Sequence, residues 1–137
     1  MRMFEAMRIS ATGLAAERLR MDLIANNLAN INTTRTAEGG PYKRQSAVFA
    51  EIMSRTRGPG GGGVRVVEVS RDTSPPQLVY DPGHPDADAT GYVAMPNVNV
   101  INEMVDMITA TRAYEANVTA VNSFKEMFLK ALEIGRG

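Results

Sequence analysis

The stretch that decides the fold is NVNVINEMVDMITATRAYEANVTAVNSFKEMFLKALEI, residues 97–134. Pro96 before it favours a helix boundary, and Asn97 or Asn99 is placed to cap the first helical turn. Neither Gly nor Pro interrupts the stretch before Gly135. It therefore predicts one helix of about 50–57 Å, at ~1.5 Å per residue. A helix of this length exceeds what the core of so small a chain can cover, so we expect it to need a partner.

Mostly apolar residues recur along this helix in alternating steps of four and three. An average step of 3.5 residues is typical of the seam along which the helices of a coiled coil meet. This C-terminal seam comprises Val100, Met104, Met107, Thr111, Tyr114, Val118, Val121, Lys125, Phe128 and Leu132. The members expected to contact a partner helix, within the chain or between chains, are Met104, Met107, Tyr114, Val118, Val121 and Phe128.

A second helical pattern runs from Phe4 to about Asn30, again in steps of four and three. This N-terminal seam comprises Met7, Ala11, Leu14, Arg18, Met21, Ala25 and Leu28. Other apolar residues, such as Leu23 and Ile24, widen the face beyond one seam and predict more than one neighbour. The seam members expected to make contacts are Met7, Leu14, Met21 and Leu28.

This helix runs into an asparagine-rich segment, ANNLANINTT, residues 25–34. Asn tolerates left-handed backbone and competes for backbone hydrogen bonds, so one interpretation is a fraying helix end. The other is a set of Asn side chains, including Asn27 and Asn30, that hydrogen-bond a neighbouring helix in an assembly. Spacing alone favours the fraying end, because Asn is common near helix ends.

Between residues 33 and 96 the helical period disappears, and turn residues separate short apolar runs. Strands are predicted within 42–53, at 64–69 (VRVVEV) and at 77–80. The run GPGGGG, residues 58–63, invites comparison with a phosphate-binding loop, but it lacks the following Lys-Ser/Thr pair and precedes a strand. It is therefore predicted to be a hairpin or exposed loop.

The segment DPGHPDADATG, residues 81–91, holds the chain's one His. Asp86 and Asp88 resemble the first half of a calcium loop, but the twelfth position is Asn97, where that loop needs a bidentate Glu. His84 has no zinc-ligand spacing around it. We interpret the segment as a rigid turn with Asp side chains bound to backbone amides. No acid/base pair or nucleophile pattern stands out, so neither an enzyme nor a metal or cofactor site is predicted.

Composition narrows the class of partner. The chain has 137 residues with 15 basic and 15 acidic ones, and the basic residues are scattered, so no nucleic-acid or small-molecule partner is predicted. Without cysteine there are no disulfides or thiolate metal sites. No apolar run is long enough to insert directly into a membrane. The start, MRMFEAMRIS, lacks the features of a cleaved signal peptide, so any export is expected to use another route.

Together these patterns predict an α+β fold, in which two long terminal helices pair as an antiparallel coiled-coil hairpin around a small β-containing insert. The expected parts are an N-terminal coiled-coil helix at 1–32, an irregular and β-containing insert at 33–96, and a C-terminal coiled-coil helix at 97–137. Uncovered helix faces favour a structural protein that assembles with copies of itself or with other proteins. A soluble coiled-coil adaptor is the alternative.

Specific motifs also carry a family resemblance. The region from Leu14 through ANNLANINTT resembles the N-terminal signature of bacterial flagellar axial proteins, those of the rod and hook. The stretches GGPYKRQ (39–45), VYDPGHPDAD (79–88) and GYVAMPNVNVINEMVDMITATRAYEANVTAVN (91–122) look like the proximal-rod members of that family. The resemblance covers nearly the whole chain, and the last two motifs are the specific ones.

This resemblance implies a structural subunit of the flagellar basal-body rod, the drive shaft that transmits torque and encloses the export channel. Such a subunit would leave the cell through the flagellar type III apparatus without signal cleavage and assemble across the periplasm. Its implied partners are itself, other rod proteins, the inner-membrane ring and export-apparatus adaptor proteins. The paired helices would line the inner tube, and the asparagine-rich segment gains weight as an interface element.

Overall fold

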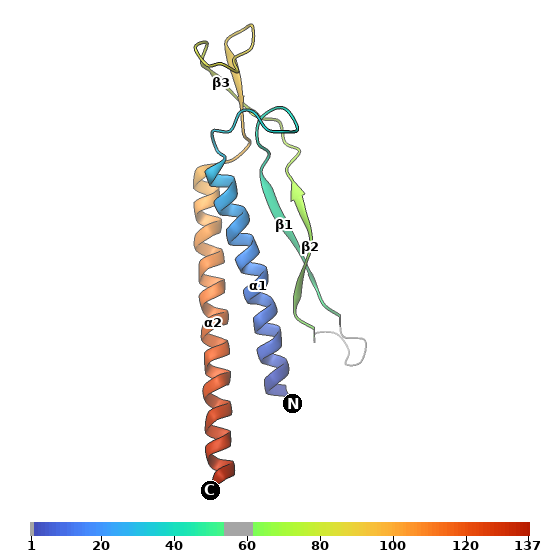
Figure 1. Cartoon of the computed structure of the whole chain (residues 1–137), viewed down its shortest axis with the longest axis vertical. Coiled ribbons are helices and arrows are strands. Elements are labelled where there is room, and N and C mark those ends of the chain that lie inside the picture. Colours follow the sequence, from blue (N-terminus) through green and yellow to red (C-terminus); the bar gives the residue numbers. More distant parts are fainter. Residues whose placement is uncertain (1, 54–61) are drawn as a thin grey trace.

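The computed structural model describes residues 2–53 and 62–137. Two antiparallel helices lie side by side, and two β-hairpins complete an elongated molecule (Figure 1). The elements in chain order are α1 (Arg2–Ala29), β1 (Gln45–Glu51), β2 (Val64–Arg71), β3 (Gln77–Tyr80), β4 (Tyr92–Met95) and α2 (Val100–Arg136). This arrangement confirms the α+β class and the two terminal helices around a small β-containing insert.

Of the two candidate caps, Asn99 is the residue that caps α2. Its side-chain oxygen accepts a hydrogen bond from the Asn102 amide at 3.1 Å, which satisfies one of the unpaired amides of the first turn. From there α2 continues for 37 residues, against 28 residues for α1. The C-terminal end of α2 therefore extends beyond the start of α1 (Figure 1).

Contacts between the two helices involve small side chains along their length and one aromatic pair near the start of α1. Ala16 and Ala110 are buried, and a Cβ at Gly13 would lie only 3.1 Å from Asn117 Nδ2. The rings of Phe4 and Phe128 meet edge to face with centroids 5.3 Å apart. Gly13 thus permits a close approach of the helices, and the aromatic pair marks the level at which α1 begins.

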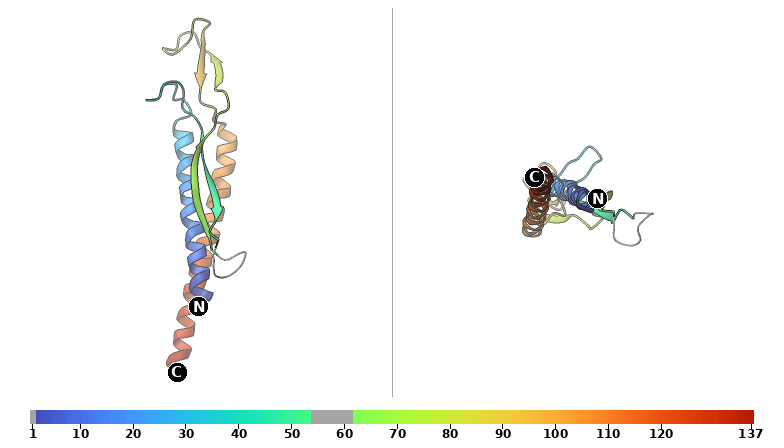
Figure 2. Two further views of the ribbon diagram at one scale, coloured as in Figure 1. Left: turned by 90° about the vertical axis from the view of Figure 1, so that its right-hand side faces the viewer. Right: turned by 90° about the horizontal axis from the view of Figure 1, so that it is seen from below.

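The hairpin of β1 and β2 lies along α1 (Figure 2). Its antiparallel register runs from Gln45 opposite Arg71 to Glu51 opposite Val64, with a bulge between Val48 and Phe49. Both strands were predicted, β1 within 42–53 and β2 two residues longer than the expected 64–69. The predicted glycine loop lies outside the described residues except for its last two positions, 62 and 63.

The second hairpin, β3 with β4, forms the end of the molecule opposite the chain termini (Figure 1). β3 matches its predicted bounds, whereas β4 was not predicted. In the connecting segment, Asp88 Oδ1 accepts hydrogen bonds from the amides of Thr90 at 2.9 Å and Tyr92 at 3.0 Å. These bonds confirm the interpretation of residues 81–91 as a turn in which an Asp binds backbone amides.

Candidate functional site

Asn27 lies at the centre of a polar junction where the end of α1, the start of β1 and the first turns of α2 meet. Its side chain is fully buried. Its Nδ2 donates to the Gln45 carbonyl at 2.8 Å and to Glu103 Oε2 at 3.3 Å. Its Oδ1 accepts from the Gln45 amide at 2.9 Å and from the Tyr42 hydroxyl at 2.7 Å. Asn27 therefore joins three elements within one chain and leaves no carboxamide hydrogen-bonding capacity unused.

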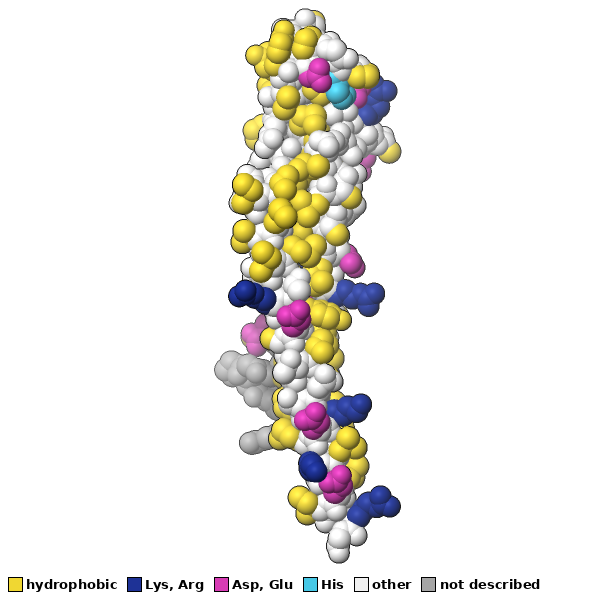
Figure 3. Space-filling model, turned by 90° about the vertical axis from the view of Figure 1, so that its left-hand side faces the viewer, with side chains coloured by type: hydrophobic (Ala, Val, Ile, Leu, Met, Phe, Trp, Pro, Cys, Tyr) yellow, Lys and Arg dark blue, Asp and Glu magenta, His cyan; other side chains and the backbone are white. Residues whose placement is uncertain are grey.

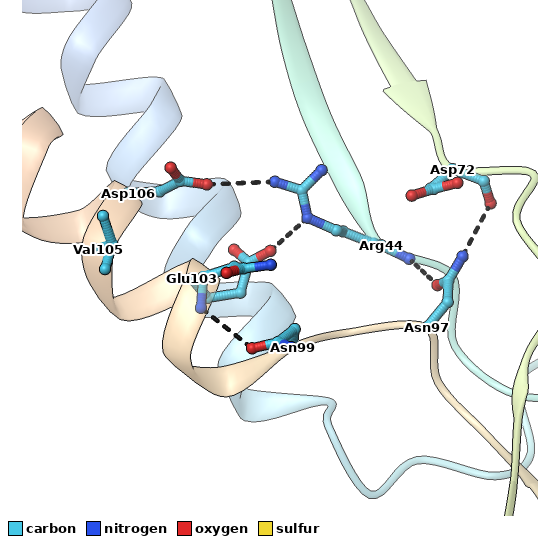
Figure 4. Close-up of a pocket in the computed structure, with 8 residues that line it drawn as sticks. Arg44, Asp72, Asn97, Asn99, Glu103, Val105 and Asp106 are labelled. Carbon is cyan, nitrogen blue, oxygen red and sulfur yellow. Dashed lines mark hydrogen bonds and ion pairs between the residues drawn. The ribbon is translucent and has the colours of Figure 1, made fainter.

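Glu103 is the second fully buried polar group of the junction. The guanidinium of Arg44 donates from Nε to Glu103 Oε1 and approaches Asp106 Oδ2 at 3.4 Å (Figure 4). A buried carboxylate is tolerated when it is paired and hydrogen-bonded, and Arg44 together with Asn27 supplies both conditions. The pair connects the residue before β1 to the first turn of α2.

Asn97 extends the network from the helices to the strands. Its Oδ1 accepts from the Arg44 amide at 3.0 Å, and its Nδ2 donates to the Ser74 carbonyl at 3.1 Å and the Asp72 carbonyl at 3.4 Å. Figure 4 shows Asn97 between the backbone of Arg44 and Asp72. The segment after β2 is thus tied to Asn97, three residues before the start of α2.

Hydrogen bonding and burial in the junction raise the pKa values of Arg44 and Tyr42. The hydrogen bond to Glu103 is the largest cause that raises the pKa of Arg44 above its usual value, against the opposing effect of burial. Burial, followed by the negative charge of Glu103, raises the pKa of Tyr42. At neutral pH both groups therefore keep the protonated forms that donate the hydrogen bonds described above.

A pocket of about 490 Å³ opens beside the junction (Figure 4). Its lining comprises Arg44, Asp72, Asn97, Asn99, Asn102, Glu103, Val105 and Asp106. These side chains can bind a cationic or amide group, and the set includes neither a hydroxyl nor an imidazole. Among the described residues, no three His, Cys, Asp or Glu side chains gather in a metal-binding group.

The carboxylate oxygens of Asp86 and Asp88, which resemble the first half of a calcium loop, are bonded to other groups of the chain. Asp86 accepts from Thr34 Oγ1 at 2.7 Å and pairs with Arg35, while Asp88 binds the amides of its own turn. The hydroxyl of Thr34 is the largest cause that lowers the pKa of Asp86. Both carboxylates hold the loop in place.

The predicted seam residues fall into three groups. Asn27 is buried in the junction, and Met104 is 56% exposed. The half-buried ones are Met7, Leu14, Met21, Leu28, Asn30, Met107, Tyr114, Val118, Val121 and Phe128. Asn30 bonds locally, donating to the Asn26 carbonyl and accepting from Thr33 Oγ1, as expected of a helix end. The seam contacts and the coiled-coil pairing remain predictions.

Sequence reasoning missed most of the junction. Tyr42, Arg44 and Gln45 lie in the quoted motif GGPYKRQ, but nothing in the sequence links them to Glu103, which is 59 residues from Arg44. The available signal was an acidic residue in the first turn of a helix. That signal is ordinarily explained by the helix dipole.

A large apolar surface lies on the outer side of α2, away from α1 (Figure 3). We call it the outer stripe; it comprises Val100, Ile101, Met104, Val105 and Ile108, which are 44% to 73% exposed. A second set, the lower patch, surrounds the C-terminal end of α2 and comprises Phe4, Met127, Leu129, Leu132 and Ile134, which are 49% to 82% exposed. Exposed apolar patches of this kind are typical of protein interaction sites.

None of the described helices combines the length and apolar character that a membrane span requires.

Comparison with known proteins gives two family matches. Residues 7–35 match the family model described as flagella basal body rod protein. Residues 89–134 match the model described as flagellar basal body rod FlgEFG protein C-terminal. The two matches fall on α1 with the chain just after it, and on β4 with most of α2.

Full-length relatives agree with these matches. The chain is 49% identical to the flagellar basal-body rod protein FlgC of Borreliella burgdorferi, over 100% of both chains. It is 46% identical to FlgC of Bacillus subtilis, over 97% of this chain and 98% of the relative. With FlgC of Salmonella typhimurium the identity is 42%, over 93% and 94%. The chain therefore belongs to the FlgC family of flagellar basal-body rod proteins, and it is a structural subunit of the basal body and not an enzyme.

Proposed function

We propose that this rod subunit assembles helically with copies of itself and with other rod proteins, and that it forms the proximal part of the drive shaft. In this arrangement α1 and α2 line the inner tube, so the assembled subunits enclose the export channel. The subunit occupies the periplasm between the inner-membrane ring and the distal rod, and it arrives through the flagellar export apparatus with the help of adaptor proteins. Family membership and the shape of the chain support this proposal.

One observation carries it: the isolated chain exposes more surface than a compact monomer of its length, and that surface includes large apolar side chains. Its accessible surface is 9580 Å². A compact monomer of this chain length exposes about 7,000 Å². Much of the excess comes from the elongated helix pair and includes the outer stripe and the lower patch. Assembly would remove these apolar groups from water, at about 25 cal/mol per Å².

Torque transmission fits the same architecture. Shear on a rod acts along many contacts when long helices pack side by side, and each contact then bears a small part of the force. The polar junction connects the end of α1, the first turn of α2 and the start of the β1–β2 hairpin through the bonds of Asn27 and Glu103. A subunit fixed in this way turns as one body.

Mass spectrometry of detergent-purified hook–basal bodies tests the proposal, with the other rod proteins as internal standards. We expect this chain in a few copies per particle, at a level comparable to those standards. Its absence from intact particles would contradict the rod position and would favour the alternative of a coiled-coil adaptor.

A substitution at the helix seam tests the assembly contacts. Val118 is half-buried, whereas Thr119 beside it is exposed. Val118→Asp places an unpaired charge in a contact from which assembly excludes water. We therefore expect loss of rod assembly and of swimming. Thr119→Asp is the matched control and should keep both. Normal swimming of the Val118→Asp strain would contradict a seam contact at this position.

A further inference from the structure

We propose that one face of the β3–β4 hairpin, at the end of the molecule opposite the chain termini, docks against a different protein of the basal body. The partner presents at least two basic side chains around an apolar depression. This inference rests on the proposed assembly with other rod proteins, and it names the surface and the chemistry of one such contact. The two terminal helices take no part in it.

The two faces of this hairpin have different surroundings. Side chains that alternate along a strand point to opposite faces, and directly opposed residues share a face. The inner face turns toward the start of α2, since Val93 is buried and Val79 lines a pocket together with Val98. The outer face is open to solvent, with Leu78, Tyr80 and Tyr92 exposed by 66%, 65% and 42%. We define the outer face by two opposed pairs of residues, Leu78 with Ala94 and Tyr80 with Tyr92.

The two tyrosines of the outer face are held in one position by the hairpin itself. Their rings, those of Tyr80 and Tyr92, meet edge to face with centroids 5.3 Å apart. The Tyr80 ring lies over Gly91, where a Cβ would come within 2.8 Å of it. The turn is closed by Asp88, whose Oδ1 accepts a hydrogen bond from the Tyr92 amide at 3.0 Å. Tyrosine is enriched among the residues that dominate binding, and a side chain that is already ordered loses little entropy on docking.

The strands of the hairpin lack the charged side chains that commonly keep free strands from associating. They read QLVY and YVAM, and each has only one strand neighbour. The β1–β2 hairpin instead has four charged side chains in its strands: Glu51, Arg65, Glu68 and Arg71. An isolated two-stranded hairpin is also marginally stable in water. These features favour a β3–β4 hairpin that another chain covers in the assembly.

Charge indicates the chemistry of the partner. Residues 72–111 include neither Lys nor Arg, although the whole chain is neutral, and their acidic residues are Asp72, Asp81, Asp86, Asp88, Glu103 and Asp106. In the turn of the hairpin, Asp86 pairs with Arg35. Within the part of the chain that the structure describes, Asp81 and Asp88 pair with no basic side chain. Asp81 directly follows Tyr80, so a cation beside it can also contact the exposed ring.

A second copy of this chain does not offer that complement. On α2, Lys130 pairs with Glu133, and other basic residues have acidic neighbours on the helix. On the β1–β2 hairpin, Arg71 pairs with an acidic residue, and the exposed Lys43 and Arg65 are separated by about seven residues of the ladder. That separation is ~23 Å at ~3.3 Å per residue, too far for both to reach one acidic rim. The occupant is therefore a different protein.

Photocrosslinking in assembled particles tests the contact. The exposed parts of the three large outer-face side chains amount to about 350 Å², less than the ~800 Å² that each partner of a stable complex buries, so the contact acts together with others in the rod. Cells carry the full chain with the photoreactive amino acid p-benzoylphenylalanine in place of Tyr80, which keeps an aromatic ring on the outer face. The matched control places it at Gln77, exposed on the other face of the same strand. Hook–basal bodies are irradiated and purified, and mass spectrometry identifies the crosslinked peptides.

A charge change tests the acidic rim. Asp81→Lys reverses a charge that makes no ion pair within the described residues, and Asp81→Asn removes it with a smaller change of side chain. Glu68→Lys, exposed on β2, is the control for the change of charge. Each is combined with the probe at position 80, and the Tm of each isolated variant is compared with that of the unmodified chain.

We expect the probe at position 80 to join a different protein, in a segment with two or more Lys or Arg residues, at least five-fold more often than the probe at position 77. Asp81→Lys should lower this yield at least five-fold at unchanged Tm, Asp81→Asn should lower it less, and Glu68→Lys should leave it within two-fold. A crosslink to a second copy, a yield that neither Asp81 variant changes, or particles that contain the chain without any crosslink would overturn the proposal. Absence of the unmodified chain from the particles would instead contradict the proposed function itself.

Discussion

The buried pair of Arg44 and Glu103 allows a quantitative test of what holds the subunit together. Arg44→Met removes the guanidinium and leaves Glu103, whose side chain is fully buried, with one hydrogen bond from Asn27 at 3.3 Å. Removing one partner of a buried pair costs about 3–5 kcal/mol. Because the Arg44 side chain is 28% exposed, some solvent screening applies, and we expect a loss of about 3 kcal/mol.

Urea-induced unfolding, followed by far-ultraviolet circular dichroism, measures this loss. With a denaturant slope of about 2 kcal/mol per molar, the midpoint should fall by about 1.5 M. The matched control is Arg71→Met at the end of β2, where the pair with Glu38 is largely exposed, with side chains 52% and 68% accessible. An exposed ion pair contributes at most about 1 kcal/mol, so this variant should change the midpoint little.

A double variant separates the missing partner from simple loss of packing. Arg44→Met combined with Glu103→Leu removes the uncompensated charge as well, so it should recover much of the stability lost by Arg44→Met. The part of the stability that is not recovered corresponds to the lost contacts with Asn27 and Asp106. Equal destabilisation by Arg44→Met and Arg71→Met would refute the reasoning, because the junction would then be no stronger than a surface pair.

Two further substitutions test the helix contact and the tyrosine of the junction. Gly13→Val pushes a side chain against Asn117, so we expect a loss of about 2 kcal/mol and a Tm lower by about 5 °C, whereas Gly135→Val, with open space around it, should leave the Tm nearly unchanged. Burial raises the pKa of Tyr42 above 10.0, so neutral Tyr42 contributes its full stability below about pH 10 and loses it as the pH rises through the folded-state pKa. Tyr42→Phe should therefore flatten the fall of unfolding free energy at alkaline pH, and the exposed Tyr80→Phe should not.

The helices and the short strands were predictable because their signals are local. Residues 97–134 contain no helix breaker, and Asn99 stands where a cap is needed, so the position of α2 follows from neighbouring residues alone. β2 and β3 likewise have runs of β-branched and aromatic residues between turns. β4, with the residues YVAM, was missed although it is as long as β3, because it lies directly between Gly91 and Pro96, which were interpreted as part of a turn and as a helix boundary.

Periodicity did not tell which apolar positions of α2 contact α1 and which are left for another chain, because α2 has apolar residues on more than one side. The predicted seam includes large side chains such as Met104, which is 56% exposed in the structure. It does not include Ala110, which is buried. Small residues lie inside because Gly13 and Ala16 let the helices approach closely. A sequence pattern records that a position is apolar, but it does not distinguish a contact within the chain from one with a neighbour.

The polar junction was beyond sequence reasoning for a different reason. Arg44 and Glu103 each have an ordinary local explanation, as a residue beside a strand and as an acid in the first turn of a helix. Only the fold brings them together, and only then does burial give the pair large consequences for stability. The two predicted Asn residues of the asparagine-rich segment also differ in their contacts. Asn27 is buried and binds Gln45, whereas Asn30 binds the Asn26 carbonyl at the end of its own helix.

The distribution of polar and apolar groups has a physical consequence for assembly. Apolar contacts are strong but tolerate many orientations, whereas a buried polar network is satisfied in one arrangement only. Asn27 and Glu103 therefore fix how α1, α2 and the β1–β2 hairpin are placed relative to one another. Because the outer stripe lies on α2, its position relative to the other elements is fixed as well. If the junction loosens, the apolar surfaces remain but point in variable directions. Arg44→Met should accordingly reduce incorporation into particles even under conditions where most of the isolated chain is still folded.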